Sequence, residues 1–240
     1  MRIVLPLLLT LLLSAAAYSD PQPGSNPGES FGPYPSIDDA ETQAFVRQGL
    51  AYAIALYGEP WMPVNRVLVK YKPSQAFTQV TDAPNGIFTI FLSRRKDEYA
   101  FHGQLAHEIA HLLNAQVFDA YAEGLNTVFA EQMLKRAGKD WRSWEAHYRK
   151  HGDPFYAATY FMMKEVSSHA GADSMRMLLA HATPEPAAPE RMYIDIDGWI
   201  GSLPSVKRDT VTNIILKHAA QVKQAMDTVT QVYSFRLPRP

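Results

Sequence analysis

The chain contains no cysteine and no excess of either charge, and both absences limit what the protein can be. Its 23 basic residues are balanced by 24 acidic ones, which leaves a formal net charge of −1 at pH 7. The densest basic run, Arg94-Arg95-Lys96, is followed directly by Asp97 and Glu98. A chain with this balance creates no strong field toward nucleic acid or an anionic membrane surface. We therefore expect neither of these among its partners.

The N-terminus has the layout of a secretory signal. Arg2 precedes an apolar run from Ile3 to Leu13, and the small residues Ala15-Ala16-Ala17 follow it. The alternative is a membrane anchor, but the run is shorter than the roughly 20 apolar residues that span a bilayer. We expect residues 1–17 to be removed as a signal peptide, which leaves the mature chain without a membrane segment.

An exported protein without cysteine cannot rely on disulfides, on which small secreted eukaryotic domains depend. A hydrophobic content of 47%, with 11% aromatic residues, supplies a core large enough to be stable without them. The expected location is therefore the bacterial periplasm or the medium outside the cell.

Residues 18–35 are dense in Pro, Gly and Ser and are expected to form a linker. A single domain is expected from residue 36 to residue 240. It begins with a helical stripe that ends near Gly58, and strands are expected at Arg66–Tyr71 and Gly86–Leu92. Residues 73–85 between the two strands contain turn formers.

The remainder of the domain is mostly helical in pattern. Helices are expected at about 99–118, 121–137, 140–150, 155–170, 172–181 and 205–232. A break at 183–189 and a short extended piece at 192–196 interrupt them. The predicted fold class is therefore α+β, with a small, mainly antiparallel or mixed sheet followed by a largely helical half.

The stretch QLAHEIAHLLN, residues 104–114, places His107, Glu108 and His111 in an otherwise apolar helix. Burial of these ionisable side chains is unfavourable in free energy unless a hydrogen-bond partner, an opposite charge or a metal ion compensates for the lost water. Residues four apart share a helix face, so both imidazoles can direct a nitrogen to one ion, and Glu108 can reach a water bound to it. Zn²⁺ lowers the pKa of such a water, and the Glu can take its proton. The alternative is a pair of core histidines that bond to backbone groups or buried carboxylates.

A catalytic zinc usually has three protein ligands, and three downstream carboxylates compete for the third position. Asp119 is expected to cap the next helix, since it directly precedes an apolar periodic segment. Glu123 and Glu131 lie eight residues apart, which is about 12 Å along a helix axis. Only one of them can therefore bind the same ion.

The segments HEIAH and YAEGLNTVFAE together resemble the gluzincin zinc metallopeptidases of the peptidase-MA-like group. In that group the helix after the His-Glu-x-x-His motif carries a Glu-Gly dipeptide whose Glu is the third ligand, which corresponds to Glu123-Gly124 here. The resemblance covers residues 36–182, although only the zinc motif is specific. It implies a zincin-like fold with the HEIAH helix buried.

The spacing of the motif departs from this pattern. Eleven residues separate His111 from Glu123, fewer than the group usually has, whereas the nineteen before Glu131 match a thermolysin-like spacing. The Glu-Gly dipeptide favours Glu123 as the third ligand, whereas the number of residues after His111 favours Glu131. We expect Glu123, with a short turn near Asp119-Ala120 that folds the second helix back beside the first.

The resemblance implies two further features. The strand before the zinc helix, Gly86–Leu92, would bind the peptide substrate as an added strand, although an ordinary edge strand fits the pattern equally well. A Tyr or His would stabilise the oxyanion that forms on the attacked carbonyl. The candidates here are Tyr156 and Tyr160, with His169 in the same region of the chain.

The predicted function is that of an exported zinc metallopeptidase that acts on a peptide or protein substrate. His107, His111 and Glu123 would bind Zn²⁺, and Glu108 would be the general base. Hydrolysis of a different amide, for example in cell-wall peptide, fits the motif as well. The alternative is a non-catalytic periplasmic binding or assembly protein on a zincin scaffold with a structural zinc. Glu108 argues against it, because a structural site does not need a buried carboxylate beside the ion.

Overall fold

The computed structural model describes residues 34–37, 39–150 and 153–239. The expected signal peptide, and all but the last two residues of the expected linker, lie outside the described residues. Within the described part of the chain, no helix combines the length and the apolar character needed to cross a membrane.

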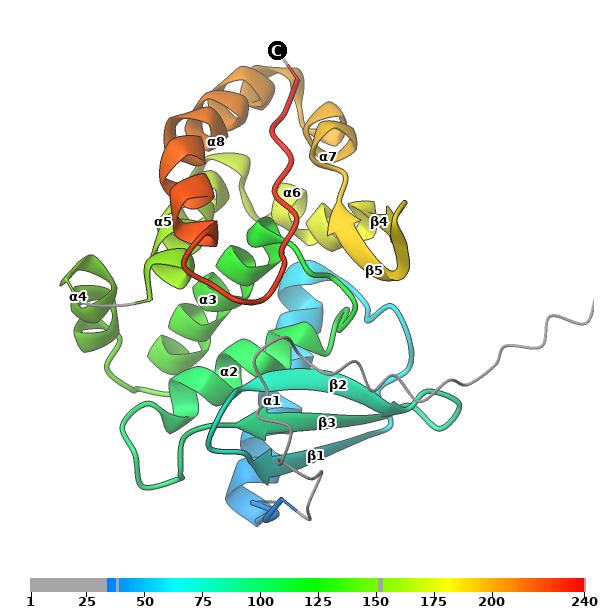
Figure 1. Ribbon diagram of the computed structural model, residues 1–240, viewed down its shortest axis with the longest axis vertical. Coiled ribbons are helices and arrows are strands. Elements are labelled where there is room, and N and C mark those ends of the chain that lie inside the picture. The colour runs from blue at the N-terminus through cyan, green and yellow to red at the C-terminus, as the bar shows by residue number, and fades with distance from the viewer. Residues whose placement is uncertain (1–33, 38, 151–152, 240) are drawn as a thin grey trace, which may run out of the picture.

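A three-stranded mixed sheet forms one side of the fold (Figure 1). It consists of β1 (Arg66–Tyr71), β2 (Phe77–Asp82) and β3 (Ile87–Leu92) in the order β1-β3-β2. β1 runs parallel to β3 and β2 runs antiparallel to it. The mixed sheet and the strands β1 and β3 were predicted. β2 was missed, because the turn formers on both sides of it masked a six-residue strand.

The position of β2 corrects the prediction for the strand before the HEIAH helix. β3 pairs with β1 on one side and with β2 on the other, so it is the central strand and has no free edge. All residues from Phe88 to Leu92 are buried. The prediction that Gly86–Leu92 adds a substrate strand is therefore wrong, because both of its hydrogen-bonding edges are already used.

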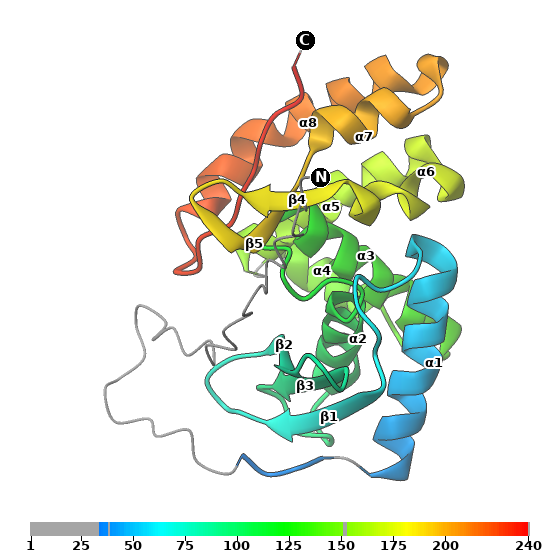
Figure 2. The same cartoon turned by 90° about the vertical axis from the view of Figure 1, so that its right-hand side faces the viewer.

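Helices α1 and α2 pack against each other beside this sheet (Figures 1 and 2). α1 (Ala40–Tyr57) begins after Asp39, whose carboxylate accepts hydrogen bonds from two backbone N–H groups of the first turn. α2 (Phe101–His111) carries the HEIAH motif and contacts β2, β3 and α1. The predicted helix there was longer at both ends.

Helix α3 (Ala120–Arg136) lies at the centre of the fold, between α2 and α5 (Pro154–Ala170). Gly124 permits the close approach of α5. A Cβ atom at this position would lie 2.3 Å from the Thr159 carbonyl oxygen and 2.6 Å from Cγ of Met163. Helix packing therefore explains the glycine of the Glu-Gly dipeptide, since any larger residue at this position would push α3 and α5 apart.

The remaining elements pack on α5 or on one another. They are α4 (Arg142–Lys150), α6 (Ala172–Arg176), a 3₁₀ turn (Leu178–His181), the hairpin of β4 (Ala182–Glu185) and β5 (Ala188–Ile194), α7 (Ile196–Ser202) and α8 (Ser205–Met226). β4 and α7 were not predicted. The described part of the chain is α+β, as expected from the sequence.

The segment after α8, residues 227–239, returns to α3 in extended form, and we name it the C-terminal strap (red in Figure 1). Ser234 N–H donates to the Phe118 carbonyl and Ala120 N–H donates to the Ser234 carbonyl, both over 2.9 Å. Tyr121 Oη donates to the Arg236 carbonyl over 2.7 Å. The prediction that the last helix continues to residue 232 is wrong: α8 ends at Met226, and the strap pairs with the backbone around Asp119 instead.

Candidate metal centre

The two histidines of HEIAH and one carboxylate of α3 meet at a single point. His107 Nε2 lies 3.1 Å from one carboxylate oxygen of Glu123, and His111 Nε2 lies 3.5 Å from the other. The two imidazole centroids are 5.2 Å apart, as expected for side chains four residues apart on one helix face. All three side chains are at most 15% exposed.

The connection between α2 and α3 directs Glu123 toward α2. Asp119 caps α3 by accepting a 2.7 Å hydrogen bond from Tyr121 N–H, and its second oxygen accepts one from Ile194 N–H at 3.2 Å. The cap and the turn near Asp119-Ala120 agree with the sequence prediction. Because α3 starts there and folds back along α2, a residue in its first turn faces the histidines.

Thr127 orients the ring of His107. Its hydroxyl donates to the Glu123 carbonyl over 2.9 Å, and the same oxygen lies 3.2 Å from His107 Nδ1. A hydroxyl has one proton, so the oxygen must accept from Nδ1–H. Nε2 of the neutral ring then carries a lone pair, which is the state in which imidazole binds a metal.

The charges in the cluster stabilise one another. Burial raises the pKa of Glu123, but the positive charge of His111 and hydrogen bonds from both rings outweigh it and lower that pKa to about 2. Burial lowers the pKa of His111, whereas the charge and hydrogen bond of Glu123 raise it to about 9. Glu123 is therefore an anion over the physiological pH range, and its surroundings favour a positive charge.

A metal ion fits this donor set. Lone pairs on His107 Nε2 and on a Glu123 oxygen 3.1 Å away repel each other unless a proton or a cation lies between them. Ligands about 2.1 Å from a tetrahedral zinc are about 3.4 Å apart, close to the two distances found here. The described residues therefore include a cluster of His107, Glu108 and His111, joined by Glu123, that could hold a metal ion.

Glu108 is also close to both rings. A carboxylate oxygen of Glu108 and one nitrogen of each histidine lie within 4.8 Å of one another, but Glu123 is nearer to both rings. The carboxylate of Glu108 is instead held by Thr78 of β2, whose hydroxyl is 3.0 Å from Oε2 and 2.9 Å from the Glu108 carbonyl oxygen. Burial raises the pKa of Glu108, and the two histidines offset only part of this effect.

Glu131 lies in a different cluster. Its Oε1 accepts from Lys135 Nζ over 2.6 Å and from Lys164 Nζ over 3.0 Å. Its Oε2 accepts from the Tyr160 hydroxyl over 2.8 Å. These bonds use both oxygens of Glu131, whereas Glu123 faces the two histidine rings.

The structure separates the two tyrosines predicted to face the reacting carbonyl. Tyr160 is fully buried, and its hydroxyl also accepts from Trp141 Nε1 over 2.9 Å and from Lys164 Nζ over 2.7 Å. It belongs to the Glu131 cluster. Tyr156, one helical turn earlier, places its ring centroid 5.6 Å from that of His107 in an edge-on arrangement. Only Tyr156 is brought beside the histidines.

Tyr233 of the C-terminal strap was not predicted to be near the site. Its ring stacks on Phe155, the neighbour of Tyr156, and the negative charges of Glu123 and Glu108 act on the phenols of both Tyr233 and Tyr156. Burial is the main cause that raises the pKa of each hydroxyl. The sequence contains no signal for this contact, because the strap reaches the site from a distant part of the chain.

The two threonines beside the site were also missed. Thr127 follows Glu123 by four residues on one helix, so helical spacing alone could have found it. Thr78 could not be found in this way, because the strand that carries it was not predicted.

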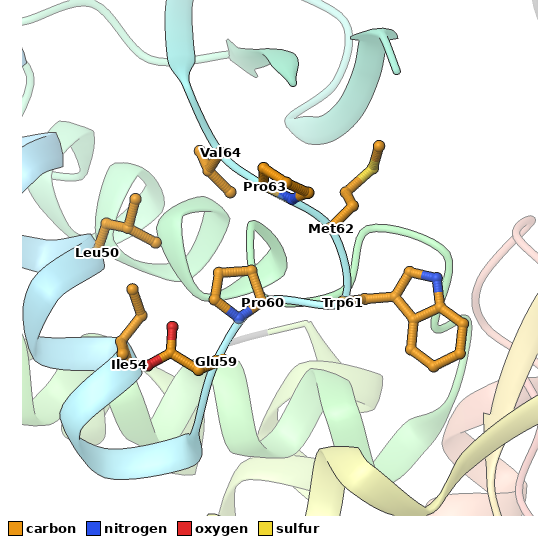
Figure 3. A pocket seen from close by; sticks show the side chains of 8 residues that line it. All are labelled: Leu50, Ile54, Glu59, Pro60, Trp61, Met62, Pro63 and Val64. Atoms are coloured by element: carbon orange, nitrogen blue, oxygen red, sulfur yellow. The ribbon is translucent and has the colours of Figure 1, made fainter. Parts of the chain in front are cut away.

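A separate hollow of about 400 Å³ lies between the end of α1 and the following loop (Figure 3). Glu59 is the one charged side chain among the residues that line it, and Trp61 is 64% exposed. The lining residues are Leu50, Ile54, Glu59, Pro60, Trp61, Met62, Pro63 and Val64. None of them belongs to the histidine cluster, and the single ionisable residue among them gives the hollow no basis for acid–base or metal chemistry.

The features that indicate a chemistry for this chain are thus local to α2, α3, α5, β2 and the strap. They are two imidazole nitrogens, two buried carboxylates and a pair of phenols within one region. Comparison of the chain with protein-family models, with curated proteins and with solved structures finds no match in any of the three.

Proposed function

We propose that the protein is an exported zinc metallopeptidase of the gluzincin type, with a zincin-like fold. The observation that carries this proposal is the convergence of His107, His111 and Glu123, with Glu108 held beside them by Thr78. Two imidazoles and one carboxylate are the ligand set of thermolysin-type catalytic zinc, which leaves a fourth position for water or substrate. A zinc ion bound there would polarise a carbonyl and lower the pKa of a water molecule.

Glu108 is the general base in this proposal. It accepts a proton from the attacking water and later delivers it to the leaving amine. Burial raises its pKa, which moves the group toward the range in which a carboxyl can both accept and return a proton near neutral pH. The hydrogen bond from Thr78 fixes the direction of the carboxylate. Tyr156 takes the oxyanion-stabilising role, since it is the phenol beside His107.

A peptide or protein substrate is the class that the surroundings favour. Among the described residues β2 pairs on one side only, and it lies beside α2 (Figure 1). Its outer edge offers backbone donors and acceptors to an extended chain. The same strand carries Thr78, so a chain bound there would pass near Glu108.

The first test is the metal content of the purified protein, measured by elemental mass spectrometry on wild type, Glu123→Ala and Glu131→Ala. We expect about one zinc per chain in wild type, retention in Glu131→Ala and loss in Glu123→Ala. Equal zinc in all three proteins would refute the ligand assignment. Absence of zinc uptake by wild type would refute the proposal as a whole.

The second test separates catalysis from a structural zinc. Glu108→Gln should keep its zinc and lower the hydrolysis of a peptide library by about 100-fold or more, because it removes the general base. An unchanged rate in this variant would contradict the mechanism. A wild type that holds zinc but cleaves neither peptides nor cell-wall amides would instead favour the non-catalytic reading, in which zinc joins α2 and α3.

A further inference from the structure

The hydroxyl of Thr78 lies between two acceptors that belong to the same residue. Its oxygen is 3.0 Å from Oε2 of Glu108 and 2.9 Å from the Glu108 backbone carbonyl oxygen. The carbonyl competes for the proton, because Leu112 N–H, which would reach it in a regular α-helix, donates to the Ile109 carbonyl over 3.1 Å. A hydroxyl has one proton, so it directs that proton to one of the two acceptors at a time. Only one of these two orientations holds the Glu108 carboxylate in place.

The position of β2 therefore determines how well Thr78 holds Glu108. Among the described residues β2 pairs with β3 only, and none of its six residues is fully buried. The pairing is also irregular between Val80 and Asp82. A strand with one free edge and an interrupted ladder is held less firmly than a central strand such as β3. A chain that binds to the free edge would steady β2 and, with it, the hydroxyl of Thr78.

A peptide bound to the outer edge of β2 would pair at Thr78 or directly beside it. Along an antiparallel edge strand, successive residues direct both of their backbone groups alternately to the partner strand and outward. The outward groups in this part of β2 thus belong either to Thr78 or to its two neighbours, Phe77 and Gln79. In both cases the bound chain, about 4.8 Å from β2, fixes the strand at the residue that contacts Glu108.

The length of the peptide decides whether this pairing forms. Each residue of an extended chain advances about 3.3 Å, so a dipeptide reaches at most one outward position of β2. A chain of about six residues or more covers the outward positions on both sides of Thr78. Binding energy gained away from the scissile bond raises kcat when it is used to orient a catalytic group.

We propose that Thr78 is a positioning residue that couples the length of the substrate to the orientation of the general base Glu108. The substrates are therefore extended peptides that pair with β2 on both sides of Thr78, whereas dipeptides and single amides are cleaved slowly. The inference rests on the proposed peptidase function.

The kinetic test uses one cleavable sequence, selected from a peptide library and shortened in steps from about eight residues to a dipeptide. In the zinc-loaded wild type we expect kcat to rise about 10-fold or more along this series. Thr78→Val should keep its zinc and lower kcat for the longest peptide about 10-fold, with KM within about threefold. Its kcat for the dipeptide should stay within about twofold of the wild-type value, and Thr78→Ser should restore the length dependence because it restores the hydroxyl.

Thr81→Val is the matched control. Thr81 lies on the same strand, and its hydroxyl oxygen is 2.6 Å from that of Thr89 on β3, so the variant loses a β2 hydroxyl that holds no part of the site. We expect its length dependence to equal that of wild type. The same kcat for all lengths in wild type, equal losses on long and short peptides in Thr78→Val, or a flattened series in Thr81→Val would each overturn the role of Thr78.

A second readout does not depend on turnover. Two phosphonate analogues, of a dipeptide and of an octapeptide, are bound to the zinc-loaded proteins, and affinity and backbone hydrogen exchange are measured. We expect only the octapeptide analogue to protect the amides of β2 in wild type, and Thr78→Val to remove about fivefold of the affinity gained with length. Equal protection by both analogues, or no binding of either, would contradict the inference. A wild type that shows the expected binding but cleaves no peptide would refute the peptidase function alone, because the coupling of length to Thr78 would still be observed.

Discussion

Thr127 determines which nitrogen of His107 is available to a metal. Its oxygen accepts from Nδ1–H because its own proton is donated to the Glu123 carbonyl. Thr127 thus contacts the ring of His107 and the backbone carbonyl of Glu123, two of the three residues proposed to bind the metal. Outer contacts of this kind fix the tautomer and the angle of a coordinating imidazole.

Thr127→Val should therefore weaken zinc binding by about 10-fold to 100-fold, because the ring loses its acceptor while the buried shape is kept. The measurement is competition with a chelator of known affinity. Thr159→Val is the control, since the Thr159 hydroxyl makes the same kind of bond to a helix carbonyl, at 2.9 Å, without touching a histidine. Equal losses in the two variants would show that the effect is general destabilisation.

Glu131 should contribute to stability and not to metal binding. Burial raises its pKa, but hydrogen bonds from Lys135, Lys164 and Tyr160 outweigh it, so the pKa lies below the ordinary value of 4.5. A carboxyl with a lowered pKa stabilises the fold above its unfolded pKa, and this contribution is lost as the pH falls through the folded pKa. Glu131→Gln should therefore lower the free energy of unfolding by about 2 kcal/mol at pH 7.

The difference between Glu131→Gln and wild type should shrink as the pH falls below about 4.5. Urea denaturation at a series of pH values measures it. A difference that does not depend on pH would contradict the charge-based explanation, and loss of zinc from this variant would favour Glu131 as the third ligand.

At the scale of elements, the contact between α3 and α5 places Tyr156 beside His107 of the candidate metal centre. That contact depends on Gly124, because the Thr159 carbonyl of α5 lies where a Cβ would be. The pair of helices therefore connects Glu123 in the first turn of α3 to Tyr156 in the first turn of α5.

Gly124→Ala should destabilise the protein by about 3 kcal/mol, since a helix shift that relieves the clash costs more than the gain in helix propensity. Activity at a permissive temperature should fall as well, because Tyr156 moves with α5. Gly201→Ala in α7 is the control, as a Cβ there meets nothing within 4 Å. That variant should be as stable as wild type or slightly more so, and equal destabilisation of both would refute the packing explanation.

At the scale of the whole molecule, a bound ion would join α2 to α3 and thus the sheet side of the fold to the helical side. An ion that binds only the folded state stabilises it by mass action, by about 4 kcal/mol at a free concentration 1,000 times Kd. For a chain of this size that corresponds to a rise in Tm of roughly 10 °C.

Removal of zinc with a chelator should accordingly lower Tm by a similar amount, measured by calorimetry with and without the metal. His111→Ala should show little response to zinc, because it lacks one of the converging nitrogens. A rise in Tm that is the same in wild type and in His111→Ala would place the stabilising ion elsewhere.

The sequence by itself determined the features that depend on local spacing. Residues four apart must share a helix face, so His107 and His111 were predicted to lie together. Periodicity likewise located most helices and two of the three strands of the mixed sheet. Asp119 was predicted as a cap because its signal lies within one turn of the helix it starts.

Only the tertiary structure decided which groups from distant segments meet. Glu123 and Glu131 share one helix, and the packing of α3 on α2 and α5 directs the first to the histidines and the second to Tyr160 and Lys164. The pairing of β2 with β3, and the return of the strap that brings Tyr233 to Phe155, depend on contacts between segments far apart in the chain. No periodicity encodes such contacts, because their free energy arises only when the separate elements pack together.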